Sequence, residues 1–87
     1  STVRLRWLAR DIGFEKVILK RNTLIGTFIA DQTNPYYQST KFTRVLNFIQ
    51  KYPKAGEMAE KKGKLRLRFD GVKSIEEALR YFNKIIE

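Results

Sequence analysis

The sequence predicts an α+β domain in which two β-hairpins form an antiparallel sheet packed by amphipathic helices. Three observations carry this prediction. Apolar residues recur at helical spacing in three segments, two pairs of β-rich runs are each joined by a short turn, and the last run alternates between apolar and charged residues. The predicted order is α-β-β-α-β-β-α, and 87 residues suffice for a single domain spanning positions 1–87.

The first predicted element is a helix over residues 2–12. Gly13 follows it directly, and glycine is the residue that most often ends a helix with positive φ. The apolar stripe that indicates this helix consists of Leu5, Leu8, Ala9 and Ile12.

The first hairpin is predicted over residues 14–21 and 24–30, which are rich in β-branched and aromatic residues. Asn22, in the link between them, tolerates the positive φ that a tight turn needs. Gly26 lies inside the second run and predicts a bulge or the close approach of another backbone.

A turn-rich connector over residues 31–39 precedes the second predicted helix. Ser39 or Thr40 is placed to cap this helix, and Pro53 ends it after Tyr52. The residues expected to face the core are Phe42, Val45, Leu46, Ile49 and Tyr52, with Phe48 widening the stripe.

The second hairpin is predicted over residues 57–62 and 64–70, followed by a third helix. Ser74 and Glu77 have the spacing of a capping box at its start. The strand alternation predicts a sheet with one dry and one wet face. The expected core contacts join Leu65, Leu67 and Phe69 to Leu79, Phe82 and the second helix.

Composition narrows the possible functions. The chain has neither cysteine nor histidine, which excludes disulfides, thiolate nucleophiles, Cys/His metal sites and Ser-His chemistry. An enzyme is therefore disfavoured, and we expect no catalytic, cofactor-binding or metal-binding residues. Eighteen basic against nine acidic residues favour polyanions or an acidic protein surface as partners.

The ends and the hydropathy of the chain suggest its context. No apolar run approaches 18 residues and no signal peptide is recognisable, so a cytoplasmic protein is expected. The chain begins inside a predicted helix, which favours a fragment of a longer polypeptide.

Two groups of residues are candidate contacts for a partner or polyanion. Lys64, Arg66 and Arg68 project from one face of the last strand, as a basic ridge or simply as a solvated face. Val3 and Trp7 lie opposite the core stripe of the first helix. We expect them to meet an upstream segment or a partner domain; alternatively, the indole folds back over the hairpin.

The connector contains two adjacent tyrosines, Tyr36 and Tyr37, beside a turn. Stacking on nucleic-acid bases is one interpretation. The favoured interpretation is that both rings cover the core while their hydroxyls remain in water.

The order of short motifs along the whole chain resembles the C-terminal domain of the bacterial transcription-repair coupling factor (Mfd) family. No single motif is specific, and the resemblance depends on their co-linearity. The residues that carry it are Arg4-Leu5-Arg6, Ala9, Ile12-Gly13-Phe14 and Lys16, then Asn34-Pro35, the helix from Phe42 to Tyr52, the strand from Leu65 to Phe69, and the final amphipathic helix.

The resemblance implies a role in a large ATP-driven translocase on duplex DNA. That protein displaces RNA polymerase stalled at lesions and recruits the damage-recognition ATPase of nucleotide excision repair. This chain is then a non-catalytic autoinhibitory domain that docks on the N-terminal repair-protein-like domain of the same polypeptide. ATP belongs to the full-length protein, and neither a cofactor nor a membrane partner is expected here.

One departure limits what the resemblance implies. The family carries acidic and aromatic residues just upstream of the Arg-Leu-Arg helix, and this sequence begins after them, so no contact residues are carried over. The alternative function, which the charge alone favours, is an independent small basic nucleic-acid-binding module.

Overall fold

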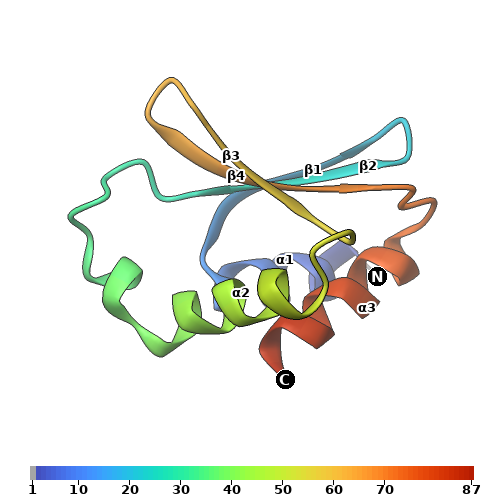
Figure 1. Ribbon diagram of the computed structural model, residues 1–87. Helices are drawn as coiled ribbons and strands as arrows, with labels where there is room; N and C mark the ends of the chain where they lie inside the picture. The colour runs from blue at the N-terminus through green and yellow to red at the C-terminus, as the bar shows by residue number, and fades with distance from the viewer. Residues whose placement is uncertain (1) are drawn as a thin grey trace.

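The computed structural model describes residues 2–87 and contains one four-stranded antiparallel sheet with three α-helices (Figure 1). This confirms the predicted α+β class and order of elements. A short 3-10 helix in the connector is an addition to the prediction. The elements are α1 (Thr2–Ile12), β1 (Phe14–Lys20), β2 (Thr23–Phe28), η1 (Pro35–Gln38), α2 (Thr40–Lys51), β3 (Glu57–Lys61), β4 (Lys64–Asp70) and α3 (Ile75–Ile86).

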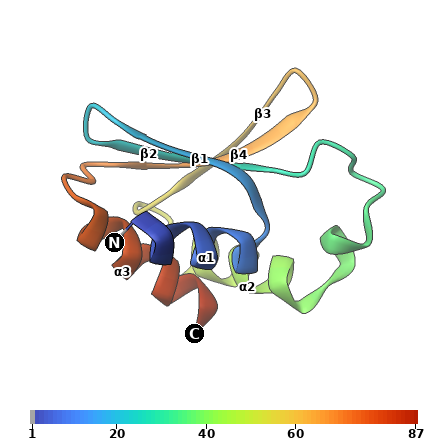
Figure 2. The same cartoon turned by 180° about the vertical axis from the view of Figure 1, so that it is seen from behind.

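The strand order is β1-β2-β4-β3, with every neighbouring pair antiparallel. The two hairpins therefore meet through β2 and β4, while β1 and β3 are the edges. All three helices lie on one side of the sheet, and no described segment covers its other face (Figures 1 and 2). The sheet thus has one dry face and one open face, as the alternation in β4 predicts.

The core lies between the dry face and the helices, with α3 packed against both α1 and α2. Leu67, Phe69 and Phe82 are fully buried, as predicted, whereas Leu65 is half-buried. Leu46 was expected in the core but is 44% exposed on α2, because Val45 and Phe48 occupy the buried side of that helix.

Both hairpin turns have positive φ at two consecutive residues, the geometry that type I′ turns require. Arg21 and Asn22 have φ of 52° and 63°, which confirms the positive φ expected at Asn22. Lys62 and Gly63 have φ of 53° and 76°. These turns pair each hairpin in register without strain from the sheet twist.

Gly26 is neither bulged nor approached by another backbone, so that prediction is wrong in detail. The register shift lies in β1, between Phe14 and Lys16. A Cβ at position 26 would lie 2.4 Å from Cε1 of the Phe14 ring, which occupies the space above the glycine. Because Gly26 has no side chain, the ring of Phe14, which the bulge in β1 turns toward the core, can pack directly on its backbone.

Serine caps begin α2 and α3 as predicted, but the reciprocal bond of the capping box at α3 is shifted by one residue, to the Lys73 N–H. Ser39 caps α2 by accepting the Phe42 N–H at 3.4 Å. At α3 the Glu77 N–H donates to Ser74 Oγ at 3.2 Å, and the Glu77 carboxylate accepts the Lys73 N–H at 2.9 Å.

Tyr36 and Tyr37 cover the core, but their hydroxyls are not left to water. The Tyr36 hydroxyl donates to the carbonyl of Ile12, and the Tyr37 hydroxyl donates to the carbonyl of Ile29. The expectation of solvated hydroxyls is therefore wrong. The backbone carbonyls at the end of α1 and just after β2 need partners, and the tyrosines supply them.

Candidate functional site

The strip formed by Val3 and Trp7, here called the α1 strip, is the most exposed apolar feature among residues 2–87. Val3 is 69% exposed and Trp7 is 77% exposed. Their i, i+4 spacing places both on one side of α1. The alternative in which Trp7 folds back over the hairpin is wrong, because the indole would then be covered.

The opposite side of α1 is buried and holds the helix in place. Leu5, Ala9 and Ile12 are buried among α3, β1 and the rest of the core. Gly13 ends the helix with φ 116°, and its N–H donates to the Ala9 carbonyl at 3.0 Å. Together with the Tyr36 hydrogen bond, these contacts hold the α1 strip outward on a packed helix.

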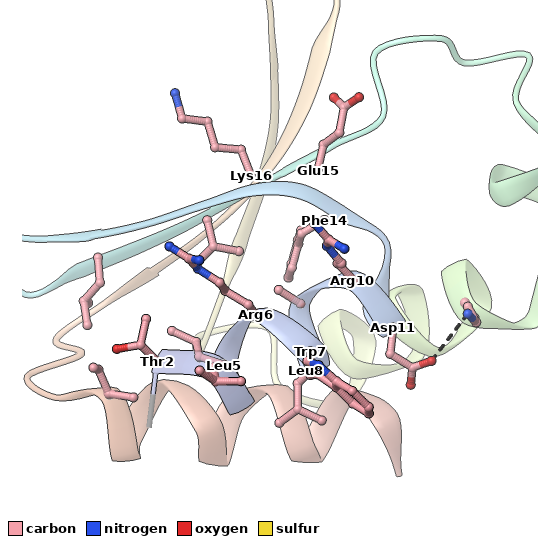
Figure 3. Close-up of a pocket in the computed structure, with 16 residues that line it drawn as sticks. Thr2, Leu5, Arg6, Trp7, Leu8, Arg10, Asp11, Phe14, Glu15 and Lys16 are labelled. Carbon is pink, nitrogen blue, oxygen red and sulfur yellow. Dashed lines mark ion pairs between the residues drawn. The ribbon is translucent and has the colours of Figure 1, made fainter.

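A shallow hollow runs along α1 and the start of β1 (Figure 3). Arg6 and Arg10 extend from α1 on its β1 side, whereas Trp7 lies on the side away from β1 (Figure 3). Asp11, the acidic residue of this helix, lies 3.4 Å from the Lys41 ammonium. The charged groups beside the α1 strip are thus mostly cationic.

Lys64, Arg66 and Arg68 lie elsewhere, on the open face of the sheet. The structure therefore separates the two groups of predicted contact residues. The strand register adds Lys16 and Lys20 of β1 to this face. It also adds Lys61 of β3, which pairs with Lys64. We call the following six residues the open-face cluster: Lys16, Lys20, Lys61, Lys64, Arg66 and Arg68.

The open-face cluster has little internal compensation. Arg68 Nε lies 3.0 Å from Asp70 Oδ1, but both side chains are more than half exposed, so this pair adds little stability. Glu57 is paired in register with Arg68, and Glu15 extends from β1 on the same side as Lys16 (Figure 3). Arg66 Nε is enclosed and has no hydrogen-bond partner among the described residues.

The titratable groups with shifted pKa values have structural explanations. Burial raises the pKa of Tyr36 well above its usual range, and burial likewise raises that of Tyr37. Hydrogen bonds from the side chain and N–H of Thr33 lower the pKa of Asp31 at an exposed turn. These shifts follow from packing and turn geometry.

Residues 2–87 hold neither a metal-ligand cluster nor a helix that could span a membrane. No three acidic side chains there gather in a group that could hold a metal ion. None of the three described α-helices has the length and apolar character needed to cross a membrane.

The comparisons with known proteins add no family to this geometry. Neither a family model, nor a curated protein, nor a solved structure matches the chain.

Proposed function

We propose that this chain is a non-catalytic autoinhibitory interaction domain of a cytoplasmic transcription-repair coupling factor. The resemblance along the whole chain supports the family, and the exposed α1 strip supports the docking role. Its partner is the N-terminal repair-protein-like domain of the same polypeptide. The full-length protein, with ATP as its fuel, acts on duplex DNA and RNA polymerase and recruits the excision-repair ATPase.

The observation that carries the docking role is the 77% exposure of Trp7 on a firmly packed helix. Aromatic side chains bury about 150–250 Å² when covered, which corresponds to roughly 4–6 kcal/mol of gross hydrophobic stabilisation. Tryptophan is also enriched among the residues that dominate binding energy at interfaces. A partner that covers Trp7 and Val3 together would therefore gain affinity from a small area.

The flanking arginines add specificity to this contact. Arg6 and Arg10 lie beside the α1 strip, and the described residues give neither of them an ion pair. Acidic groups on the docking surface would complement them and exclude basic surfaces, because electrostatic complementarity contributes mainly specificity and association rate.

The experiment adds this domain in trans to a coupling factor from which its own C-terminal domain has been deleted. We expect the wild-type domain to reduce the ATPase rate of the truncated motor. Trp7→Ala should raise the concentration of domain needed for half-maximal inhibition at least tenfold. Leu46→Ala is the matched control, because Leu46 is also exposed but lies on α2. It is expected to inhibit like the wild type.

Tryptophan fluorescence gives a second measurement, since Trp7 is the single tryptophan of the chain. The free domain is expected to emit at long wavelength and to be quenched readily by iodide. Addition of the repair-protein-like domain should shift emission to shorter wavelength and protect the indole. Unchanged emission together with an unaffected ATPase rate would refute the proposed function.

A further inference from the structure

We propose that the open face of the sheet binds the phosphate backbone of a nucleic-acid duplex without reading its sequence. This inference is independent of the proposed docking role, because it depends on the other side of the molecule. The strand register gathers cations of β1, β3 and β4 onto one uncovered face.

The register arranges the open face in rows that run across the strands. The middle row holds Ile18, Ile25, Arg68 and Glu57, and Lys20, Thr23 and Asp70 form the row beyond it. On the other side, Lys16, Thr27, Arg66 and Ala59 form a row, and Lys64 pairs with Lys61 near the turn.

The spacing of these rows suits a duplex. Neighbouring strands lie about 4.8 Å apart, so β1 and β3 are about 14 Å apart across the sheet. This is comparable with the roughly 12 Å width of the major groove. Lys16 on one edge and Lys61 on the other, one row further along, can thus reach phosphates on opposite sides of a groove, with Arg66 between them.

The charge of the face is available for a ligand. Six basic residues stand against three carboxylates: Glu57 and Asp70 neighbour Arg68, and Glu15 extends from β1 beside Lys16 (Figure 3). The other five cations form no ion pair within residues 2–87. Thr23 and Thr27 add hydroxyls, and such groups commonly donate hydrogen bonds to phosphate oxygens.

The same face is poorly suited to an acidic protein or to single-stranded bases. Protein interfaces deplete charge from their centre and enrich aromatic residues there, whereas this centre holds only Ile18 and Ile25 beside Arg68. Single-strand binding depends on aromatic rings on which bases stack, and no aromatic residue lies on this face. A rigid array of phosphates is the partner that remains.

The open face and the α1 strip lie in different layers of the molecule. The helices, including α1, occupy one side of the sheet, and the open face is on the other (Figures 1 and 2). A duplex on the sheet would therefore leave the α1 strip free for its partner domain, and variants of one surface should not disturb the other.

The test measures binding of the 87-residue chain to a fluorescent 20-base-pair duplex DNA of arbitrary sequence at several salt concentrations. If about four of the six cations contact phosphates at once, the slope of log K against log salt should be about −3.6. This slope corresponds to a gain in affinity of roughly 300-fold when the salt concentration falls from about 150 to about 30 mM. Near physiological salt the Kd should be about 10⁻⁴ M, typical of binding without sequence preference.

Paired variants that remove equal charge locate the site. Arg66→Gln with Arg68→Gln removes two cations from the open face, and Arg44→Gln with Arg80→Gln removes two exposed cations from the helices. The first pair should reduce the slope by about 1.8 and weaken binding at low salt at least tenfold. The second pair should change affinity less than about threefold.

Two further variants control for misfolding and for the separate docking role. Lys16→Gln with Lys20→Gln alters only exposed residues, so it reports on the face even if the Arg66 variant fails to fold. It should weaken binding like the first pair. Trp7→Ala should bind the duplex like the wild type, which separates this proposal from failure of the docking role.

Three results would overturn the proposal. The helix pair could weaken binding as much as the sheet pairs, which would indicate attraction by net charge without a site. Polyglutamate could displace the duplex at equal charge concentration, which would indicate an acidic protein as partner. A single-stranded oligonucleotide could bind more tightly than the duplex, which would contradict the choice of a rigid double helix.

Discussion

Gly26→Ala tests the aromatic packing against β2, because two opposing effects decide whether the substitution raises or lowers the free energy of unfolding. Alanine is favoured over glycine within a strand by about 0.5–1 kcal/mol, so an open site would gain stability. Here the new Cβ would lie 2.4 Å from the Phe14 ring. That ring has Phe28 at 4.7 Å and Phe82 at 5.4 Å between centroids, so it cannot simply retreat.

Overpacking of this kind costs about 1–3 kcal/mol, which exceeds the gain from the backbone. We therefore expect Gly26→Ala to lower the free energy of unfolding by about 1–2 kcal/mol and Tm by roughly 5–15 °C. Urea denaturation followed by circular dichroism measures the change. The cost of Gly26→Ala should shrink in a Phe14→Leu background, with a coupling of at least 0.5 kcal/mol. A neutral or stabilising Gly26→Ala would refute this account of the packing.

Three further predictions concern the helices and the connector. Phe82→Ala should cost about 3–5 kcal/mol in urea denaturation because the ring is fully buried, and a loss under about 1 kcal/mol would mean that α3 is not docked as described. Ser74→Ala should cost about 1 kcal/mol through loss of the hydrogen bond to the Glu77 N–H, whereas Ser74→Asp should retain most of the stability. Burial raises the folded-state pKa of Tyr36 above its unfolded value of about 10, so stability should be constant below that pH and fall as the pH rises beyond it. Tyr36→Phe should weaken this fall in urea titrations at pH 8 to 11, and an unchanged pH dependence would contradict the assignment.

The sequence predicts the elements well because their signals are local. Helical spacing, the Ser74 cap and the turn at Asn22 depend on residues within a few positions of one another, and all three are confirmed. Leu46 and Gly26 were misjudged because the outcome depends on distant residues. The apolar residues of α2 cover more than one side of the helix, and only the packing of the other elements decides which side is buried. The ring of Phe14 lies against Gly26 because of the bulge in β1.

The candidate surfaces were predictable in part. Helical geometry placed Val3 and Trp7 opposite the core stripe, and the structure exposes both. Lys61 pairs with Lys64 through the local turn of the second hairpin, so its place on this face follows from the predicted hairpin. Lys16 and Lys20 could not be assigned to this face beforehand, since no local signal indicates that β2 pairs with β4. The strand order alone brings Lys16 and Lys20 to the face of Arg66 and Arg68.

The pairing of β2 with β4 also has a consequence for how the chain folds. Each hairpin closes through a two-residue turn, whereas β2 and β4 join residues about 40 positions apart, such as Thr27 and Arg66. Contacts between residues far apart in the sequence require the closure of a long loop, and the entropy lost in closing it lowers the folding rate. The hairpins should therefore form early and their docking should limit the folding rate. Mutations that weaken contacts within either hairpin would then slow folding, because those contacts are already formed in the transition state, whereas mutations of contacts made only after docking would mainly speed unfolding.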